Sequence, residues 1–447
     1  MFEKILIANR GEIALRILRA CQELNIKTVV VYSQADSNAK YVQLADEKVC
    51  IGSPPSSSSY LNIPAIISAC EITKAQAIHP GFGFLSENAQ FARCVEESGF
   101  IFIGPNHKTI ELMGNKINAK QAMMAANLPT ITGYNHNISN DKQALTMAQE
   151  IGYPLILKAA AGGGGRGMKI VNNDHELLEN LATTKYEASI NFNNDEIYAE
   201  TYLDSPRHIE VQILADQYGN VIHLGDRDCS MQRRQQKVIE EASAINISNA
   251  NKQQIYEASI QACQSINYIG AATLEFLYQN DKFYFMEMNT RLQVEHTVTE
   301  MVTNIDIVKE QIYIASGEKL RYSQSNVQLQ GHAIECRINA ESPDTFIPSP
   351  GIIKSLHFPG GNGVRVESHI SNNYEVTPYY DSMIAKIIVH AENRKAAIKK
   401  MLTALAETEI VGIDTNILLH HKLLTNQNFI NTPQSINFLE NLLANNG

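Results

Sequence analysis

The segment FYFMEMNTRLQVE, residues 283–295, alternates apolar and polar side chains along its length. Alternate side chains of an extended strand share one face. On this pattern one face carries Glu287, Asn289, Arg291, Gln293 and Glu295, and the other carries Met286, Met288, Leu292 and Val294. Phe283 and Phe285 precede the polar residues on the same side, which indicates a face that begins buried. The alternative is an amphipathic edge strand with a solvated polar face.

A partner strand is predicted at Ala272–Tyr278, just before this segment. A three-residue turn centred near Asp281 would place Glu275 opposite Glu287, whereas a two-residue turn would break that register. Like charges directly opposite each other destabilise a sheet unless something neutralises them. A divalent cation held by both carboxylates and the amide oxygen of Asn289 would do so, and oxygen ligands favour Mg²⁺ or Mn²⁺.

Two charged residues follow the predicted metal ligands. The guanidinium of Arg291 offers a planar fork that suits a planar oxyanion such as bicarbonate or a carboxylate. The carboxylate of Glu295, farther along the segment, is placed to act as a general base. A structural Arg–Glu pair explains the same spacing, so both interpretations stand.

A glycine run, GGGGRG at residues 162–167, lies between two predicted strands, Pro154–Lys158 and Met168–Val171. A dinucleotide fingerprint must open a helix, and a Walker A loop needs a following Gly-Lys-Ser/Thr, so neither applies. The run instead joins a hairpin, and its bare backbone amides favour a mobile flap that closes over phosphates. A plain flexible hairpin is the alternative. Lys116 and Lys158 are candidate phosphate partners beside the flap.

The first third of the chain alternates strand-like and helix-like patterns. Lys4–Ala8 and Thr28–Tyr32 are predicted strands, and Glu12–Leu24 between them is a predicted helix. The alternation recurs around Ala77–His79 and Phe100–Ile103. This repeat predicts a doubly wound parallel sheet, an α/β fold.

The last part of the chain, from about residue 330, contains short β-like runs and closes with helices at Arg394–Thr408 and His420–Leu424. These patterns predict a mainly antiparallel β domain with helices, so the chain is α+β in part. A chain of 447 residues also exceeds one ordinary core. We therefore predict three domains: residues 1–113, residues 114–317 with a lid at about 131–203, and residues 330–447.

Three further segments carry polar groups. Residues 197–203 form a predicted strand that runs into a loop, where exposed backbone groups could hydrogen-bond to the edge of an adenine ring. Residues 207–213 place His208, Glu210 and Gln212 on one face. Residues 226–237 gather four cations, which indicates either an anion pocket or a solvated charged surface. Arg337 lies on a β-like run, and its position alone assigns it no function.

Composition argues against several classes of protein. The net charge of −10 disfavours general nucleic-acid binding, and no apolar run approaches the roughly 20 residues of a transmembrane helix. The opening residues MFEKILIA read directly as a strand and not as a targeting leader. The seven cysteines form no CxxC pair, so a zinc site or disulfide framework is not expected. We expect a cytoplasmic protein that contacts no membrane and no nucleic acid.

Several longer motifs occur in order along the chain. They are HPGFGFLSENA at 79–89, MGNK at 113–116, KAAAGGGGRGM at 158–168, RDCSMQRRQQKVIEEA at 227–242, EMNTRLQVEHTVTEM at 287–301, GHAIECRINAE at 331–341 and YYDSMIAK at 379–386. Through them the chain resembles, over essentially its whole length, the biotin carboxylase subunits of bacterial acetyl-CoA carboxylase, which belong to the ATP-grasp superfamily. The resemblance implies a ligase that uses ATP and bicarbonate to carboxylate biotin through carboxyphosphate.

The resemblance also implies residue roles. ATP binding is expected at Lys116, Lys158, Gly162, Gly163, Gly164, Gly165, Glu200, Leu203, His208, Gln232, Gln235, Glu275 and Glu287. Metal binding, with two Mg²⁺ or Mn²⁺ ions, is expected at Glu275, Glu287 and Asn289. Bicarbonate binding is expected at Lys237, Arg291, Gln293, Val294 and Arg337, and biotin binding at Arg337 and Phe82. The expected catalytic residues are Arg291, Lys237, Glu295, which would remove the bicarbonate proton, and Arg337, which would stabilise enolate-like biotin.

Some positions depart from the family pattern. Phe82 replaces the usual tyrosine near biotin, and Gln235 stands where His or Asn is commoner. Ala161 shortens the glycine run, and Thr297 and Ser243 replace prolines. None of these changes removes a charge that the chemistry requires.

The chain has no Ala-Met-Lys-Met biotinylation motif, so the resemblance implies biotin on a separate carrier protein and carboxyltransfer on further subunits. A homodimer is expected from the family. The acyl acceptor stays open: acetyl-CoA carboxylase in fatty acid synthesis is the first reading, and a split pyruvate or acyl-CoA carboxylase is the alternative. Another ATP-grasp ligase and a non-catalytic nucleotide-binding subunit are the more distant rivals.

Overall fold

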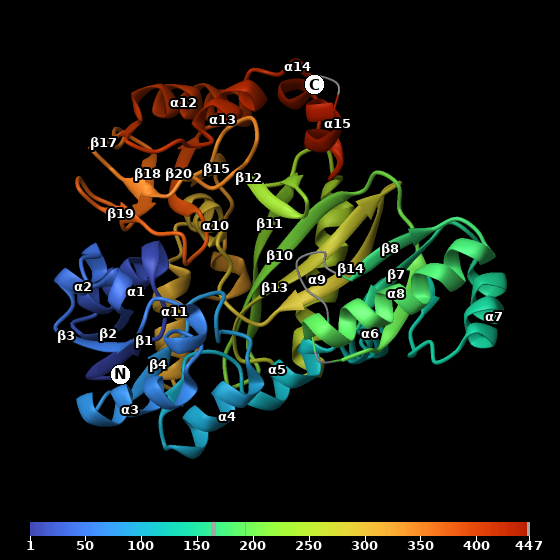
Figure 1. Cartoon of the computed structure of the whole chain (residues 1–447), viewed down its shortest axis with the longest axis horizontal. Helices are drawn as coiled ribbons and strands as arrows, with labels where there is room; N and C mark the ends of the chain where they lie inside the picture. Colours follow the sequence, from blue (N-terminus) through green and yellow to red (C-terminus); the bar gives the residue numbers. More distant parts are fainter. Residues whose placement is uncertain (162–166, 193, 445–447) are drawn as a thin grey trace.

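The computed structural model describes residues 1–161, 167–192 and 194–444. The glycines predicted to form the flap, Gly162 to Gly165, lie outside these ranges. Figure 1 shows an N-terminal unit in blue, a small sheet with two long helices in teal and green, and C-terminal elements in orange and red, arranged around a long central sheet. None of the helices in the described ranges is long and apolar enough to cross a membrane.

The N-terminal unit is a five-stranded parallel sheet in the order β3-β2-β1-β4-β5. Its strands are β1 (Lys4–Ile7), β2 (Lys27–Ser33), β3 (Glu47–Gly52), β4 (Ala77–His79) and β5 (Ile101–Phe102), and its helices are α1 (Gly11–Glu23), α2 (Lys40–Leu44), α3 (Ile63–Thr73), α4 (Ala89–Glu97) and α5 (His107–Gly114). Ile5 and Ile7 pack into one core with α1, whereas Leu6 packs into a second core with α3 and α4. Helices therefore cover both faces, and the predicted doubly wound parallel sheet is confirmed.

A four-stranded sheet in the order β6-β9-β7-β8, here called the lid sheet, lies within residues 131–203. Its strands are β6 (Gly133–Tyr134), β7 (Leu155–Ala159), β8 (Met168–Val171) and β9 (Ile197–Thr201), and α7 (Asp141–Ile151) and α8 (Asp174–Phe192) pack on it. β7 and β8 pair antiparallel on either side of the glycine run. The predicted hairpin is therefore confirmed, and so is the strand predicted before Leu203.

The central sheet has eight antiparallel strands in the order β14-β13-β10-β11-β12-β15-β20-β18. These are β10 (Arg207–Ala215), β11 (Val221–Arg233), β12 (Gln236–Ala242), β13 (Gly270–Gln279), β14 (Lys282–Asn289), β15 (His332–Asn339), β18 (Val364–Ser368) and β20 (Met383–Ala391). The C-terminal strands β15, β18 and β20 are antiparallel as predicted, but these three do not form a separate sheet. They extend the sheet that β10–β14 begin, so side chains from both regions reach one surface.

The other elements surround this sheet. They are β16 (Gly351–Ile352) paired with β19 (Glu375–Val376), β17 (Ser355–His357) paired with β21 (Glu409–Val411), and the helices α6 (Lys116–Ala125), α9 (Asn249–Ser265), α10 (His296–Thr303), α11 (Ile307–Ala315), α12 (Arg394–Glu407), α13 (Ile417–Leu424), α14 (Gln427–Asn431) and α15 (Phe438–Ala444). The C-terminal helix predicted at 394–408 is α12, and that at 420–424 is the end of α13. In Figure 1, α12 and α13 lie beside the C-terminal half of the sheet.

The turn between β13 and β14 differs from the prediction. It has two residues, Asn280 and Asp281, both with positive φ, so the predicted three-residue turn is wrong. Glu275 nevertheless lies opposite Glu287. A β-bulge restores this register, because Met286 is one residue more on β14 than β13 has to oppose.

The bulge also changes which residues share a face. Phe283, Phe285 and Met288 all pack into the same core, so Glu287 does not share a face with the two phenylalanines, and that prediction is wrong. The strand also ends at Asn289. The single polar face predicted as far as Glu295 is therefore wrong beyond this residue: Glu295 directly precedes α10.

Candidate active site

A cavity of about 830 Å³ opens where the N-terminal unit, the lid sheet and the central sheet meet. The predicted site residues on its wall are Phe82, Lys116, Lys158, Leu203, His208, Gln232, Gln235, Lys237, Glu275, Glu287, Asn289, Arg291, Gln293, Val294, Glu295 and Arg337. Glu200 is buried beside Lys158, and the flap glycines lie outside the described residues. The structure thus brings residues far apart in the sequence to one surface.

One end of the cavity is apolar. Its wall there comes from Ile131, Ile156, Met168, Leu203, Leu277, Met286 and Ile436. Sequence reasoning missed most of these because an apolar residue on a strand is indistinguishable from a core residue. Met286 reaches the cavity through the bulge, which no local pattern in the sequence announces.

The acidic pair lies beside the lid. Glu275 and Glu287 face each other across β13 and β14, and the Asn289 amide donates to Oε1 of Glu275 at 2.8 Å. The ammonium of Lys116 contacts Oε2 of Glu287. Burial alone would raise the pKa of Glu275, but the charges of Lys237 and His208 hold it well below its usual range. Two carboxylates and an amide oxygen in this arrangement suit a hard divalent cation.

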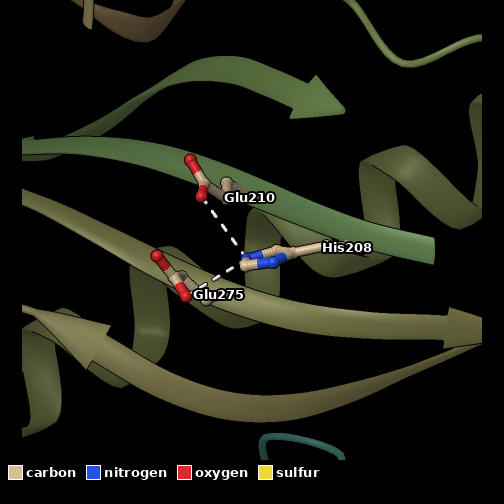
Figure 2. Close-up of side chains that lie close together, drawn as sticks. All are labelled: His208, Glu210 and Glu275. Atoms are coloured by element: carbon tan, nitrogen blue, oxygen red, sulfur yellow. Dashed lines mark ion pairs between the residues drawn. The ribbon is translucent and has the colours of Figure 1, made fainter. Parts of the chain in front are cut away.

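His208 lies between two carboxylates on neighbouring strands, as Figure 2 shows. Its Nε2 is 3.4 Å from Oε1 of Glu210 and 3.1 Å from Oε2 of Glu275. Burial opposes the charged imidazole, yet the charge and hydrogen bond of Glu275, together with the charge of Glu210, raise the pKa of His208. The face predicted for residues 207–213 is confirmed, and it points at the acidic pair.

Lys237 holds three carboxylates together. Its Nζ contacts Glu210, lies 3.1 Å from Glu275 and lies 2.6 Å from Glu295. These charges overcome burial and raise the pKa of Lys237 well above its usual value. Arg227, fully buried behind it, donates from Nε to Glu210 at 3.0 Å.

The four cations of residues 226–237 therefore do not share one environment. Lys237 lines the cavity and Arg227 is buried in the sheet. The guanidinium of Arg233 stacks over the ring of Phe346 at 3.6 Å, and Arg234 is exposed. The solvated-surface alternative fits Arg234, which is exposed, whereas the anion pocket stays a prediction for Lys237 on the cavity wall.

Glu295 is fully buried between two cations. Its Oε1 accepts from Lys237, and its Oε2 accepts from Nη2 of Arg337 at 2.9 Å. Burial alone would raise the pKa of Glu295, but Lys237 and Arg337 lower it below its usual range. The Nε of Arg337 also donates to Glu240 at 2.5 Å. Glu295 is therefore ionised, and both of its oxygens are held in place.

Arg291 pairs with a residue that sequence reasoning did not single out. Its Nε donates to Oε2 of Glu87 at 2.8 Å, and its Nη2 donates to Asn289 at 2.9 Å. Oε1 of Glu87 accepts from the backbone N–H of Thr290 at 3.0 Å. The structural Arg–Glu pair left open above thus exists, but with Glu87 and not Glu295. The signal was the HPGFGFLSENA motif, which carries Glu87.

Three models of known families match the chain in sequence. They are "Biotin carboxylase, N-terminal domain" at residues 1–110, "Carbamoyl-phosphate synthase L chain, ATP binding domain" at residues 115–323 and "Biotin carboxylase C-terminal domain" at residues 335–441. The chain is also 59% identical over 445 residues to a biotin carboxylase from Allochromatium vinosum, which covers 99% of each chain.

Solved structures give the same assignment. The fold is similar to that of a biotin carboxylase from Campylobacter jejuni in complex with β-γ-ATP, with a TM-score of 0.97, 50% identity and 99% of each chain covered. It is also similar to the biotin carboxylase domain dimer of 2-oxoglutarate carboxylase from Hydrogenobacter thermophilus, solved with MgADP, ADP and bicarbonate, with a TM-score of 0.95, 46% identity and 99% and 98% covered. The chain therefore belongs to the biotin carboxylase family of ATP-dependent ligases.

Proposed function

We propose that the cavity binds ATP with Mg²⁺ at its lid end and bicarbonate beside Glu295, and that the protein carboxylates biotin presented by a carrier protein. The observation that carries this proposal is the grouping of Lys237, Arg291 and Arg337 next to the opposed pair Glu275 and Glu287 in one cavity. Three cations and a carboxylate pair at one surface match a reaction between a metal-bound polyphosphate and a small anion.

The apolar end of the cavity suits the adenine ring. Leu203, Met286 and Ile436 offer apolar contacts, and Tyr202 and Leu203, which follow the end of β9, also line the cavity. Lys158 and Lys116 line the same cavity, and Lys116 contacts Glu287 of the acidic pair, so both are available to the phosphates of a nucleotide. The C. jejuni relative is described in complex with β-γ-ATP, which agrees with this placement.

Glu275, Glu287 and Asn289 fit Mg²⁺ because all three offer oxygen ligands and the two carboxylates already attract cationic groups. The ion would draw charge from the transferring phosphoryl group. Before it binds, Lys116 and Lys237 balance the acidic pair. Mn²⁺ has the same preference for oxygen and is the second choice, and a second ion bound with the nucleotide is part of the proposal.

Bicarbonate would lie among Lys237, Arg291 and Gln293, beside Glu295. The cations that lower the pKa of Glu295 would also stabilise the dianion that bicarbonate forms when it loses its proton. Proton transfer from bicarbonate to Glu295 therefore does not depend on the proton affinity of Glu295 alone. The bicarbonate oxygen attacks the γ-phosphorus, ADP leaves, and the resulting carboxyphosphate breaks down to CO₂ and phosphate.

Biotin would bind on the part of the cavity wall that Arg337 supplies, and Phe82 lines the same cavity. The guanidinium of Arg337 is fixed by Glu240 and Glu295, so it is oriented to stabilise the negative ureido oxygen that would form when the ureido nitrogen gives its proton to the released phosphate. That nitrogen would then attack CO₂ to give carboxybiotin. Phe82 supplies a ring without a hydroxyl, and its backbone carbonyl accepts from Asn9 at 2.7 Å.

The proposed partners are a biotin carrier protein, carboxyltransferase subunits and a second copy of the chain. Acetyl-CoA is the first choice of final acceptor, in fatty acid synthesis. A split carboxylase acting on another acid is the second, because one similar structure belongs to a 2-oxoglutarate carboxylase and is described as a dimer. We place the protein in the cytoplasm, since its substrate is ATP and its seven cysteines are free.

ADP release from the purified protein tests the activity. We expect release to require bicarbonate and to rise when free biotin is added. ADP release that does not depend on bicarbonate, or that requires a different carboxylate, would contradict the proposal and favour another ATP-grasp ligase. Carboxylation assays with candidate carrier proteins, followed by transfer to acetyl-CoA, pyruvate or 2-oxoglutarate, would separate the acceptors.

A further inference from the structure

A buried carboxylate joins two lysines beneath the nucleotide end of the cavity. Glu200 on β9 accepts from Lys158 on β7 at 2.6 Å through Oε2, and from Lys120 on α6 at 2.8 Å through Oε1. Lys120 also donates to the carbonyl of Ile131 at 2.7 Å. One carboxylate therefore links α6 to two strands of the lid sheet.

The two lysines differ in what else they can reach. Lys158 lines the cavity, so its ammonium can turn from Glu200 towards a phosphate. Lys120 is 3% exposed and both of its hydrogen bonds are to residues of the lid, so its ammonium does not reach the cavity or a phosphate bound there. The flexible stem of a lysine allows this movement at small cost, because its charge is a single point.

The electrostatics explain why two lysines are needed. Burial alone would raise the pKa of Glu200, but Lys158 and Lys120 lower it, so the carboxylate is ionised. An ionised carboxylate that is 3% exposed must keep a cationic partner. If Lys158 were its sole partner, a phosphate could gain Lys158 only by leaving Glu200 unpaired.

We propose that Lys120 is a positioning residue for ATP: it neutralises Glu200 and so leaves Lys158 free to bind the nucleotide phosphates. This inference rests on the proposed function, since it takes Lys158 as a phosphate ligand. The role of the Glu200 side chain is then to orient Lys158 before the nucleotide arrives, and not to contact the nucleotide itself.

Calorimetric titration with ATP and with adenosine tests the proposal on four proteins: wild type, K120M, E200Q and the double variant K120M/E200Q. We expect K120M to weaken ATP binding by about tenfold or more, because Glu200 then retains Lys158. Adenosine has no phosphate, so its affinity should stay within about twofold of wild type. In K120M/E200Q no carboxylate competes for Lys158, and ATP affinity should return to within about threefold of that of E200Q.

Lys185 provides a matched control on the same lid. It lies on α8 and donates to the carbonyl of Ser139 at 3.0 Å, away from the cavity wall. K185M should bind both ligands as wild type does. If K120M unfolds, the comparison of E200Q with K120M/E200Q still tests the proposal, since a large loss of ATP affinity there would overturn it.

The outcomes separate this inference from the proposed function. A wild-type protein that binds no ATP would refute the proposed function. Wild-type binding with K120M unchanged would overturn the role of Lys120 alone. Equal losses for ATP and adenosine in K120M would also overturn it, because they would show a structural role without selectivity for the phosphates.

Discussion

Glu240 on β12 and Glu335 on β15 lie directly opposite each other in the central sheet, and both side chains are fully buried. Arg337 donates to Glu240, and the hydroxyl of Thr297 donates to Glu335. A proline at the position of Thr297 would supply no such hydroxyl. Burial raises the pKa of Glu240 to about 8; Arg337 opposes this rise and Glu335 adds to it. The pair therefore retains a proton at neutral pH, and the charge of Arg337 remains directed at Glu295.

This pair predicts a pH-dependent stability. The folded pKa of Glu240 is above its ordinary value of 4.5, so its contribution to stability is fully present below about pH 4.5 and is lost as the pH rises towards 8. E240Q does not titrate. The free energy of unfolding of wild type minus that of E240Q should therefore fall, by on the order of a few kcal/mol, between pH 5 and pH 8.

Urea denaturation of both proteins at several pH values measures this difference. The exposed residue Glu257 on α9 supplies a control, since E257Q should follow wild type at every pH. Parallel stability curves for wild type and E240Q would show that the buried pair does not retain a proton.

A charge change in the acidic pair Glu275 and Glu287 should abolish turnover without unfolding the protein. E287K places an ammonium where the metal and Lys116 must meet a carboxylate, so both the metal and the phosphates lose their partner. We expect biotin-dependent ADP release to fall at least about a hundredfold. E257K, with the same charge change on an exposed helix, should keep the activity. Substantial biotin carboxylation by E287K would contradict the metal assignment.

Substitutions of Arg291 and of its partner Glu87 should impair the use of bicarbonate and leave ATP binding largely unchanged. R291A should leave ATP binding largely intact and abolish turnover, since Arg291 lines the cavity and is proposed to bind bicarbonate and not the nucleotide. E87A should raise the KM for bicarbonate by about tenfold, because Arg291 loses the carboxylate that orients its Nε. The KM for ATP should stay within about twofold.

Initial rates at varied bicarbonate and varied ATP separate these two constants for E87A. Glu97, exposed at the end of α4, supplies the control variant E97A, which should match wild type in both. A rise in the KM for ATP equal to that for bicarbonate would show that Glu87 supports the whole cavity and not Arg291.

Sequence periodicity predicted the alternating sheets well, because the 3.6- and 2-residue patterns record which side chains face a core. It failed at β14 for a physical reason. A bulge adds one residue, changes the face of every residue after it and leaves no mark in the hydrophobic pattern. The opposition of Glu275 and Glu287 was predicted correctly from a turn of the wrong length, because the bulge compensates for the shorter turn.

Most residues of the cavity wall were predictable one by one, but not the pairs that they form. Motifs supplied Arg291, Glu295 and Arg337, whereas their partners come from strands and loops distant in sequence. Glu87 is 204 residues from Arg291, and Glu240 is 97 residues from Arg337. The sheet order, in which β12 lies beside β15, brings Glu240 and Arg337 together.

Lys386 on β20 is fully buried where three regions of the chain meet. Its Nζ donates to the carbonyl of Val294 at 2.6 Å and lies 3.2 Å from Oε1 of Glu12 at the start of α1. Burial raises the pKa of Glu12 to about 7, against the lowering effect of Lys386. K386M removes that cation, so the pKa of Glu12 should rise further and the ionised carboxylate should become costly.

K386M should therefore lower the free energy of unfolding by about 3 kcal/mol at pH 8. The loss should be smaller at pH 5, because a group with a raised pKa loses its contribution to stability only as the pH rises through that pKa. In E12Q/K386M the carboxylate is gone, and most of the stability should return. Val294 is one of the expected bicarbonate-binding residues, and its carbonyl loses the Lys386 donor in both K386M and E12Q/K386M. The KM for bicarbonate should therefore be higher than that of wild type in both variants. K399M, on the exposed side of α12, should change neither quantity. If the double variant recovered its stability and also its wild-type KM, the Val294 contact would be irrelevant to bicarbonate, and Lys386 would serve only to neutralise Glu12.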